Sequence, residues 1–509
     1  MAELIDRPFP PGSYPVVVVG SGPGGLQISY GLSRFGIDHA VLSADEAPGG
    51  MFRRWPFFQR LLSWTKPYAP VPHTDPAYQR YDWNSLLADE PENQALMPAL
   101  MDGASYFPSR PEMQENLELF ATRTGIRIRH GCRWTGTRRE TAADGSDEFV
   151  IETTDGEYRT PIAIFAVGVA EPAAPDTPGI EFATHYAGTR PAETYADRRV
   201  FIIGKQNSGF ELASGLLQWA RGIVLASPSP AKLSVNTRSL VGVRARYVQP
   251  VEDHVLGGGV TILDAKIGHI GRLAGGEFEV VVQPTGGGDE IRFEVDEVIA
   301  ATGFRAPLLD LPDLGVTTFG QSRLPAVTPY WESASVPGLF FGGTLSQAAG
   351  GLKKHGLPAN SGAVHGARYN ARVLTRRIAT ARFGSTAAME RPPIAADSLV
   401  DWMAGALMSA PELFHQRAYL ARVVSLDPSA GPRDEGVVPL AAFVDGTGSD
   451  GTGDALAVTL EADGTGAIYP VIYTRRGGRL DEAVLDPDPL LRYDTPAVRA
   501  RLAELAKPG

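Results

Sequence analysis

The sequence has very little cysteine: Cys132 is the only one among its 509 residues. A single thiol cannot form an intrachain disulfide, a CxxC redox pair or a metal centre made of several thiolates. We therefore exclude enzymes that pass electrons through a cysteine pair of their own chain, and we predict no metal site.

Long hydrophobic runs are also missing. No apolar segment approaches the length needed to span a bilayer, and the start of the chain, MAELIDRPFPPGSYP, lacks the cationic and apolar regions of a secretion signal. Charge of one sign is not clustered either: 47 Lys and Arg against 58 Asp and Glu give a formal net charge of −11. We expect a soluble, cytoplasmic protein that binds neither nucleic acid nor membranes.

The sequence does contain two strand, glycine-turn and helix units. The length and the 43% hydrophobic content predict two or three packed domains. In the first unit, PVVVVGSGPGG, four valines precede the GxGxxG glycines Gly20, Gly22 and Gly25. The first glycine makes the tight turn, the second admits a pyrophosphate, and the third lets the helix lie close to its strand. This pattern predicts a dinucleotide site.

The ribose side of this first site departs from the usual pattern. An acidic residue normally ends the second strand and binds the ribose. Here Ser43 follows the strand 40–42, and Asp45 comes two residues later. Either side chain could reach a ribose hydroxyl. The loop that follows contains Gly50 among aromatic and cationic residues, which would let its backbone run against a flat ring system.

The second unit, VFIIGKQNSGFELA, has a substituted middle position. Gly204 makes the turn and Gly209 opens the helix, but Gln206 stands where the second glycine is expected, followed by Asn207 and Ser208. The Gln206 side chain would either push the pyrophosphate outward or donate an amide hydrogen bond to it. We expect nucleotide binding that is retained but altered.

The residues after the next strand bear on the choice of coenzyme. Ser227 and Ser229 occupy the positions where an NAD site usually has a carboxylate, and Lys232 and Arg238 follow. Without an acid, nothing there repels a 2′-phosphate. The pattern favours NADPH over NADH, although these residues could also form a solvated loop.

Two further segments, FAVGVAEP and DEVIAATGFRAP, each end an apolar strand with glycine and then proline, as expected where a chain crosses between domains. We predict an α/β fold of two Rossmann-like domains, the second inserted in the first. The expected divisions are a first dinucleotide domain over 1–180 and 296–380, an inserted domain over 181–295, and a small C-terminal module over 381–509. Asp-Gly turns between alternating strands predict a mixed or β-rich module.

The ordered set GSGPGG, GVAEPAAPDTPGIEFATHY, GKQNSGFELA, DEVIAATGF and FFGGT resembles the flavin-containing monooxygenases and the N-hydroxylating monooxygenases, over residues 14 to 379. The resemblance implies FAD in the first fold and NADPH in the inserted one. It also implies that O₂ adds to C4a of the reduced flavin and that the hydroperoxide oxygenates a nucleophile. Besides Ser43 and Gln206, one more departure is FATHY, which keeps Phe182 and His185 without a glycine between them.

The resemblance also implies residues near the flavin. Those implied to contact a cofactor are Trp64, Thr65, Thr302, Gly303, Gly343 and Asn360. A helix beginning near Asn360 would direct its positive end toward the flavin C2 carbonyl and N1. The segment SWTKPY, which contains Lys66, would lie by the reactive face, with ordinary loop packing as an equal alternative.

A compact cationic group precedes that helix: Lys353, Lys354 and His355. These residues and Lys66 are the candidate catalytic residues, which could hold the carboxylate of an amino-acid-like substrate or the flavin itself. The alternative is a pair of exposed lysines beside a capping loop. We predict N-hydroxylation of a small polar amine or amino acid with NADPH and O₂.

Two other functions fit the same motifs. A reductase that passes electrons from NAD(P)H to a quinone or another soluble acceptor would not consume O₂ in making its product. The third hypothesis is a flavin-binding sensor that has lost its nucleotide site, and Gln206 is the one feature that supports it. The C-terminal module could cover the active site or form the contact of a homodimer.

Overall fold

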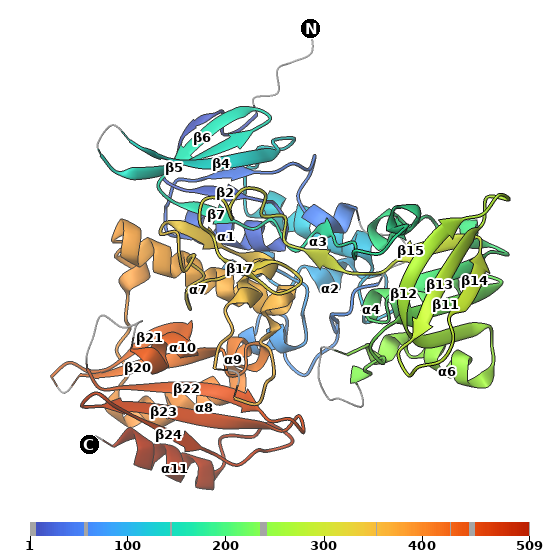
Figure 1. Cartoon of the computed structure of the whole chain (residues 1–509). Coiled ribbons are helices and arrows are strands. Elements are labelled where there is room, and N and C mark those ends of the chain that lie inside the picture. Colours follow the sequence, from blue (N-terminus) through green and yellow to red (C-terminus); the bar gives the residue numbers. More distant parts are fainter. Residues whose placement is uncertain are drawn as a thin grey trace. The chain divides into compact units, whose positions relative to one another are not determined.

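The computed structural model describes residues 7–54, 60–142, 145–234, 242–352, 354–427, 429–446 and 453–507. The chain forms two compact units. The first contains Met1–Phe52, Ser63–Val169 and Ala306–Gly509, and the second contains Arg53–Leu62 and Ala170–Arg305. The second unit is therefore inserted in the first, as the sequence predicts (Figure 1).

A four-stranded parallel sheet forms the centre of the first unit. Its order is β19-β7-β2-β3, with strands Leu339–Phe341, Ala163–Phe165, Val17–Val19 and Ala40–Leu42. Every residue of these strands is buried, because both faces of the sheet are covered. The continuous apolar runs in the sequence reflect this double burial.

Helices cover one face of this sheet, and a second sheet covers the other (Figure 1). Helix α1 (Pro23–Arg34) contacts β2, α7 (Val364–Phe383) and α3 (Arg110–Arg123) pack against α1, and α2 (Met97–Leu100) packs against α3. The second sheet has the order β1-β6-β5-β4, from Gly12–Ser13, Gly156–Thr160, Asp147–Thr153 and Trp134–Thr141. Trp134 and Phe149 of this sheet pack against Phe165 and Phe341 of the parallel one. A short hairpin, β17 (Thr318–Phe319) with β18 (Leu324–Pro325), precedes β19.

The second unit has a seven-stranded sheet of order β14-β13-β12-β11-β10-β15-β9. Its strands are β9 (Thr184–His185), β10 (Arg199–Ile203), β11 (Gly222–Ser227), β12 (Val260–Arg272), β13 (Phe278–Pro284), β14 (Ile291–Val295) and β15 (Glu297–Ala300). Helices α4 (Asn207–Leu216) and α6 (Gln249–Leu256) accompany it. β12 pairs in parallel with β11 over its first half and then forms an antiparallel hairpin with β13.

The two crossing segments pair with each other. β8 (Glu171–Pro172) is antiparallel to β16 (Phe304–Arg305), and Arg305 Nε donates to Glu171 Oε1 at 2.9 Å. Because both short strands pack with the second unit, the boundaries between the units on either side of the insertion fall at 169/170 and 305/306. The sequence predicts them at 180/181 and 295/296.

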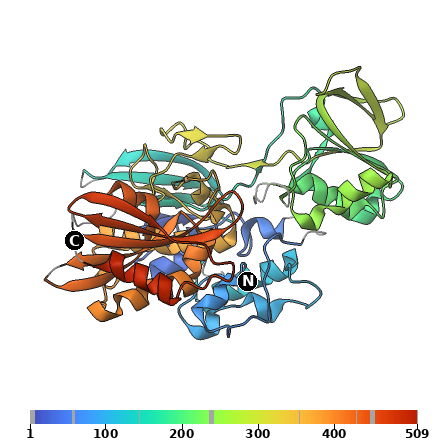
Figure 2. The ribbon, with the colours of Figure 1, turned by 90° about the horizontal axis from the view of Figure 1, so that it is seen from below.

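The C-terminal module is an antiparallel sheet of order β21-β20-β22-β23-β24 with helices around it (Figure 2). Its elements are α8 (Leu399–Ser409), α9 (Pro411–His415), β20 (Leu420–Asp427), β21 (Gly431–Pro439), α10 (Leu440–Asp445), β22 (Ala455–Ala462), β23 (Ile468–Arg476), β24 (Arg479–Val484) and α11 (Pro496–Ala506). The Asp-Gly turn between β22 and β23 is closed by the Asp463 carboxylate, which accepts from the backbone N–H of Thr465 at 2.8 Å.

This module packs onto the rest of the first unit through buried and partly buried polar contacts. Gln416 Nε2 donates to Asn370 Oδ1 at 2.7 Å and to Ser361 Oγ at 2.9 Å, so the module reaches helix α7 directly. Arg376, also on α7, donates to the backbone carbonyl of Glu435 at 3.1 Å. Within the described ranges, no helix combines the length and apolar character that crossing a bilayer requires.

The core of the second unit contains a buried carboxyl group on α4, that of Glu211. The Tyr186 hydroxyl donates to Glu211 Oε2 at 2.7 Å. Burial raises the pKa of Glu211 from 4.5 to about 7, with hydrogen bonds from Tyr186 and Tyr247 partly opposing the rise. The folded unit therefore holds a proton that the unfolded chain releases between these two pH values.

This titration makes the second unit less stable as pH rises. Its contribution to stability is fully present below pH 4.5 and is lost as pH rises through about 7. The variant Glu211→Gln should remove that dependence and exceed the parent protein by roughly 3 kcal/mol above neutral pH. Hydrogen exchange of the β10 and β11 amides, corrected for intrinsic rates, measures the difference. The exposed Glu252→Gln in the same unit is the control, and an equal pH slope in all three proteins would contradict the expectation.

Candidate functional site

The first glycine turn is built on backbone contacts that leave no room for side chains. Gly20 has φ +112°, and a Cβ on it would lie 2.5 Å from the carbonyl oxygen of Ala166. A Cβ on Gly25 would lie 1.9 Å from the carbonyl oxygen of Gly20. The start of α1 is thereby pressed against its own strand, with its free N–H groups at the carboxyl end of the sheet.

The second turn repeats this construction. Gly204 has φ +120°, and its Cβ would lie 2.4 Å from the carbonyl oxygen of Ala301. A Cβ on Gly209 would lie 2.2 Å from the carbonyl oxygen of Gly204. Helix α4 therefore starts on its strand in the same way as α1, which is the arrangement that binds a dinucleotide pyrophosphate.

The middle positions of the two turns share a backbone conformation. Gly22, before α1, has φ −72° and ψ −178°, and Gln206, before α4, has φ −112° and ψ −167°. Both are extended, so Gln206 is unstrained, and its side chain is exposed. No atom lies within 4 Å of a Cβ placed on Gly22, so the first turn keeps open the space that a pyrophosphate would fill.

Two other segments close around the first turn. A Cβ on Gly24 would lie 2.3 Å from Gly343 Cα, and a Cβ on Gly50, whose φ is +61°, would lie 3.2 Å from Gly22 Cα. Gly49 N–H donates to the carbonyl of Ser21 at 2.9 Å. Backbone thus surrounds the start of α1 on three sides, and these residues fit the diphosphate of FAD.

The two candidate ribose ligands differ in their surroundings. The hydroxyls of Ser43 and Ser21 share a buried hydrogen bond of 2.7 Å, and Ser43 Oγ also accepts from the N–H of Asp45 at 3.1 Å. Asp45 is partly exposed. Ser43 thus holds the strand end to the turn, and Asp45 is the residue of the pair with exposed surface for a ligand.

The SWTK segment presents an aromatic surface. Trp64 is 38% exposed, its ring centroid lies 4.6 Å from that of Trp83 and 6.3 Å from that of Tyr106, and Lys66 is exposed beside it. Thr65 is fully buried and its hydroxyl donates to Asp82 at 2.8 Å. Thr65 anchors the segment, whereas Trp64 and Lys66 face outward.

The start of α7 is joined to the C-terminal module. A 3-10 turn at Asn360–Gly362 precedes the helix, which begins at Val364, and Asn360 Nδ2 donates to the carbonyl of His415 at 2.7 Å. The rings of His365 and Trp83 lie 4.2 Å apart, and those of His365 and His415 lie 5.1 Å apart. Burial, and then the nearby His365 and Arg368, hold the pKa of His415 well below its usual value.

The described part of the cationic group predicted before α7, Lys354 and His355, packs against the C-terminal sheet. Lys354 forms ion pairs with Glu461, at 3.2 Å, and with Glu482, and it lies 4.8 Å from the Tyr473 ring centroid. His355 shares a 2.6 Å hydrogen bond with the Tyr469 hydroxyl. These contacts give both residues a structural role, and their catalytic role stays a prediction. Lys353 lies outside the described residues.

Asn207, Ser208 and Ser227, predicted to bind the second nucleotide, lie in the second unit. Asn207 Oδ1 accepts from Arg244 N–H at 3.0 Å, Ser208 is in the first turn of α4, and Ser227 ends β11. Arg238 lies outside the described residues. Gly303, with φ +85°, follows Thr302, whose hydroxyl donates to the carbonyl of Ala173. Thr302 and Gly303 thus join the two crossing segments, and a role in FAD binding stays a prediction.

Cys132 lies in the core of the first unit. The side chain is buried among the residues of both sheets, and burial raises the pKa of its thiol. A buried thiol with a raised pKa is a poor nucleophile, because the thiolate is the reactive form.

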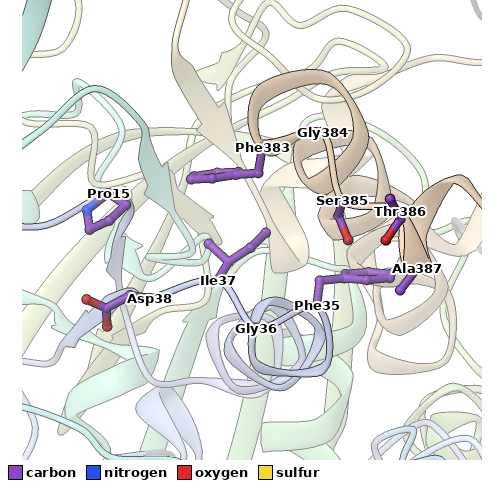
Figure 3. Close-up of a pocket in the computed structure, with 10 residues that line it drawn as sticks. All are labelled: Pro15, Phe35, Gly36, Ile37, Asp38, Phe383, Gly384, Ser385, Thr386 and Ala387. Carbon is purple, nitrogen blue, oxygen red and sulfur yellow. The ribbon is translucent and has the colours of Figure 1, made fainter.

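A cavity of about 650 Å³ lies in the first unit, lined by residues 35–38 and 383–387 and by Pro15 (Figure 3). It is at the C-terminal ends of α1 and α7, and a helix of 12 residues is about 18 Å long. The cavity is therefore separate from the glycine turn at the other end of α1.

Several residues at these sites are absent from the sequence-based set: Trp83, His365, His415 and Lys205. The first three come from separate segments and meet only through tertiary packing. No local sequence motif contains these three residues together, so the sequence alone does not identify them as neighbours. Lys205 lies inside the GKQNSG motif, but the motif does not show that its ammonium group forms an ion pair with Asp264 of β12.

Comparisons with known proteins agree with this geometry. Residues 17–343 match the family described as pyridine nucleotide-disulphide oxidoreductase. The chain is 27% identical over 388 residues to FAD-dependent oxidoreductase domain-containing protein 2 of Mus musculus, covering 71% of this chain and 57% of the relative. It is 22% identical over 347 residues to probable indole-3-pyruvate monooxygenase YUCCA4 of Arabidopsis thaliana, covering 58% of this chain and 76% of the relative. The chain thus spans little more than half the length of the mouse protein.

The fold is also found among solved structures. Bacillithiol disulfide reductase Bdr from Staphylococcus aureus aligns with a TM-score of 0.56 and 13% identity, over 73% of this chain and 99% of that one. The predicted α/β fold with two Rossmann-like domains is confirmed, and the family match supports the broader prediction of an oxidoreductase. The chain belongs to the pyridine nucleotide-disulphide oxidoreductase family.

Proposed function

We propose that this protein is an NADPH- and O₂-consuming flavin monooxygenase. The observation that supports this most directly is the state of its single cysteine: Cys132 is buried in the core of the first unit. Reduced flavin cannot pass electrons to a cysteine pair of this chain, so the acceptor comes from outside. Similarity to the Arabidopsis monooxygenase favours O₂ over another soluble acceptor.

The residues of the chain would act mainly by binding and positioning. The N–H groups at the start of α1 would bind the FAD pyrophosphate, and Asp45 would accept a hydrogen bond from the ribose. The start of α4 would bind the pyrophosphate of NADPH in the same way. When bound, FAD supplies the redox chemistry that accepts a hydride from the nicotinamide and reacts with O₂.

The narrower part of the proposal is N-hydroxylation of a small polar amine or amino acid. The exposed Lys66 suits a substrate carboxylate, and the exposed faces of Trp64 and Tyr106 suit a cationic amine. Lys354 is engaged by two carboxylates, so Lys66 is the better placed of the described candidate lysines.

The function is tested first by anaerobic reduction. Mixing the yellow protein with NADPH, and separately with NADH, should bleach the visible flavin band faster with NADPH. On admitting O₂ with an amine substrate, product should form in equal amount to O₂ consumed. Bleaching followed by reduction of a quinone without O₂ consumption would identify a reductase instead. No bleaching by either nucleotide would contradict NADPH use.

Replacing Gly22 with valine should abolish FAD retention. The backbone there is extended and the surrounding space is open, so the apoprotein should still fold, but the side chain would occupy the pyrophosphate space. The measurement is the flavin-to-protein absorbance ratio after purification, with Gly286→Val in an exposed loop as control. A folded Gly22→Val protein that purifies fully yellow would refute the assignment of this turn.

Replacing Gln206 with glycine tests whether its side chain obstructs the pyrophosphate or donates a hydrogen bond to it. Because that side chain is exposed and the backbone already matches Gly22, the change should tighten NADP⁺ binding, about threefold or more, if the side chain only narrows the pyrophosphate space. Isothermal titration of the oxidised holoprotein gives the Kd. Weaker binding would instead identify the Gln206 amide as a donor to the phosphate.

A further inference from the structure

The residue that follows the first glycine is buried in both nucleotide turns. In the first turn this residue is Ser21, whose hydroxyl meets that of Ser43 at the end of β3, the strand beside β2. In the second turn it is Lys205. Both side chains therefore run sideways along the carboxyl edge of the sheet, beneath the place where a nucleotide binds.

Lys205 reaches one strand further than Ser21. Its side chain is 1% exposed, and its ammonium group donates to the carbonyl of Leu263 at 2.6 Å and forms an ion pair with the Asp264 carboxylate. Asp264 lies opposite Ser227 in the parallel ladder between β11 and β12. The lysine thus spans from the end of β10 past β11 to β12.

Asp264 is held in place on the other side. Its backbone carbonyl accepts from both the N–H and the hydroxyl of Thr285, at 2.8 Å and 3.0 Å. Its carboxylate is 48% exposed, in contrast to the buried lysine. An acidic group therefore stands beside Ser227, at the strand end where the sequence shows only serine.

An acidic group at the end of the second strand of such a fold accepts a hydrogen bond from the ribose 2′-hydroxyl and repels a 2′-phosphate. Lys205 offsets the charge of Asp264. We propose that the Lys205–Asp264 pair is the determinant of coenzyme choice, with Lys205 neutralising Asp264 so that the 2′-phosphate of NADPH is accepted beside Ser227. This inference rests on the proposed use of NADPH.

Lys205 acts here as a positioning residue. It is buried beneath the edge and does not itself present a free ammonium group to the nucleotide. Removing its charge leaves a half-exposed carboxylate that water can still solvate, so the fold should tolerate the change. Removing the charge of Asp264 leaves the lysine with the Leu263 carbonyl and an amide oxygen as acceptors.

The test uses 2′,5′-ADP and 5′-AMP as probes, titrated by calorimetry into the oxidised holoprotein without turnover. Lys205→Met should weaken 2′,5′-ADP binding about tenfold and change 5′-AMP binding less than about twofold. Asp264→Asn should shift the ratio of the two affinities the other way, toward 2′,5′-ADP. The double variant should return the ratio close to that of the parent protein.

The exposed Arg272→Met, at the last residue of β12, is the matched control. Lys232→Met tests the other described lysine that the sequence offers to a 2′-phosphate. Flavin content and melting temperature check that each variant is folded. An unchanged ratio in Lys205→Met and Asp264→Asn would overturn the inference, as would a loss confined to Lys232→Met. Asp264→Asn keeps the test decisive if Lys205→Met does not fold.

Failure of the parent protein to bind either probe would refute the proposed nucleotide site as well. If the variants change the ratio of the 2′,5′-ADP and 5′-AMP affinities but the protein does not consume O₂, this inference holds and the proposed monooxygenase activity fails.

Discussion

Contact between backbone atoms at the glycine turns is the constraint on which the two nucleotide sites depend. At Gly20, Gly25, Gly204 and Gly209 a Cβ would lie 2.5 Å or less from a carbonyl oxygen. This contact presses α1 onto β2 and α4 onto β10, and it directs the free N–H groups of both helices to the carboxyl ends of the strands. Everything else at these sites, including the loops at Gly50 and Gly343, is arranged around helices fixed in this way.

The sequence predicts the features that are encoded locally. Glycine spacing after an apolar strand identifies both turns, and glycine followed by proline identifies both crossing segments, because each pattern acts through neighbouring residues. The sequence does not predict the contacts of Lys354 and His355. The same residues would suit a substrate carboxylate or a distant sheet, and their contacts with the C-terminal sheet arise only from tertiary packing.

At the ribose ends of the two sites, too, the sequence predicts the residues at the strand ends but not their neighbours from other segments. Reading along the chain finds Ser43 and Ser227 at strand ends, but it does not find the Ser21 hydroxyl under one or Asp264 beside the other. Asp264 comes from the next strand, so its proximity to Ser227 depends on sheet order. A carboxylate supplied by a neighbouring strand leaves no fingerprint at the position where it acts.

Cys132 gives the chain an internal reporter. The sequence has one thiol, and that thiol is enclosed by the parallel sheet β19-β7-β2-β3 and the sheet β1-β6-β5-β4. A small alkylating reagent can therefore reach it only when this core opens. The rate of labelling in native buffer thus follows the opening of a single defined place, without any engineered probe. Any ligand that binds the closed first unit would slow that rate in proportion to the stability it adds.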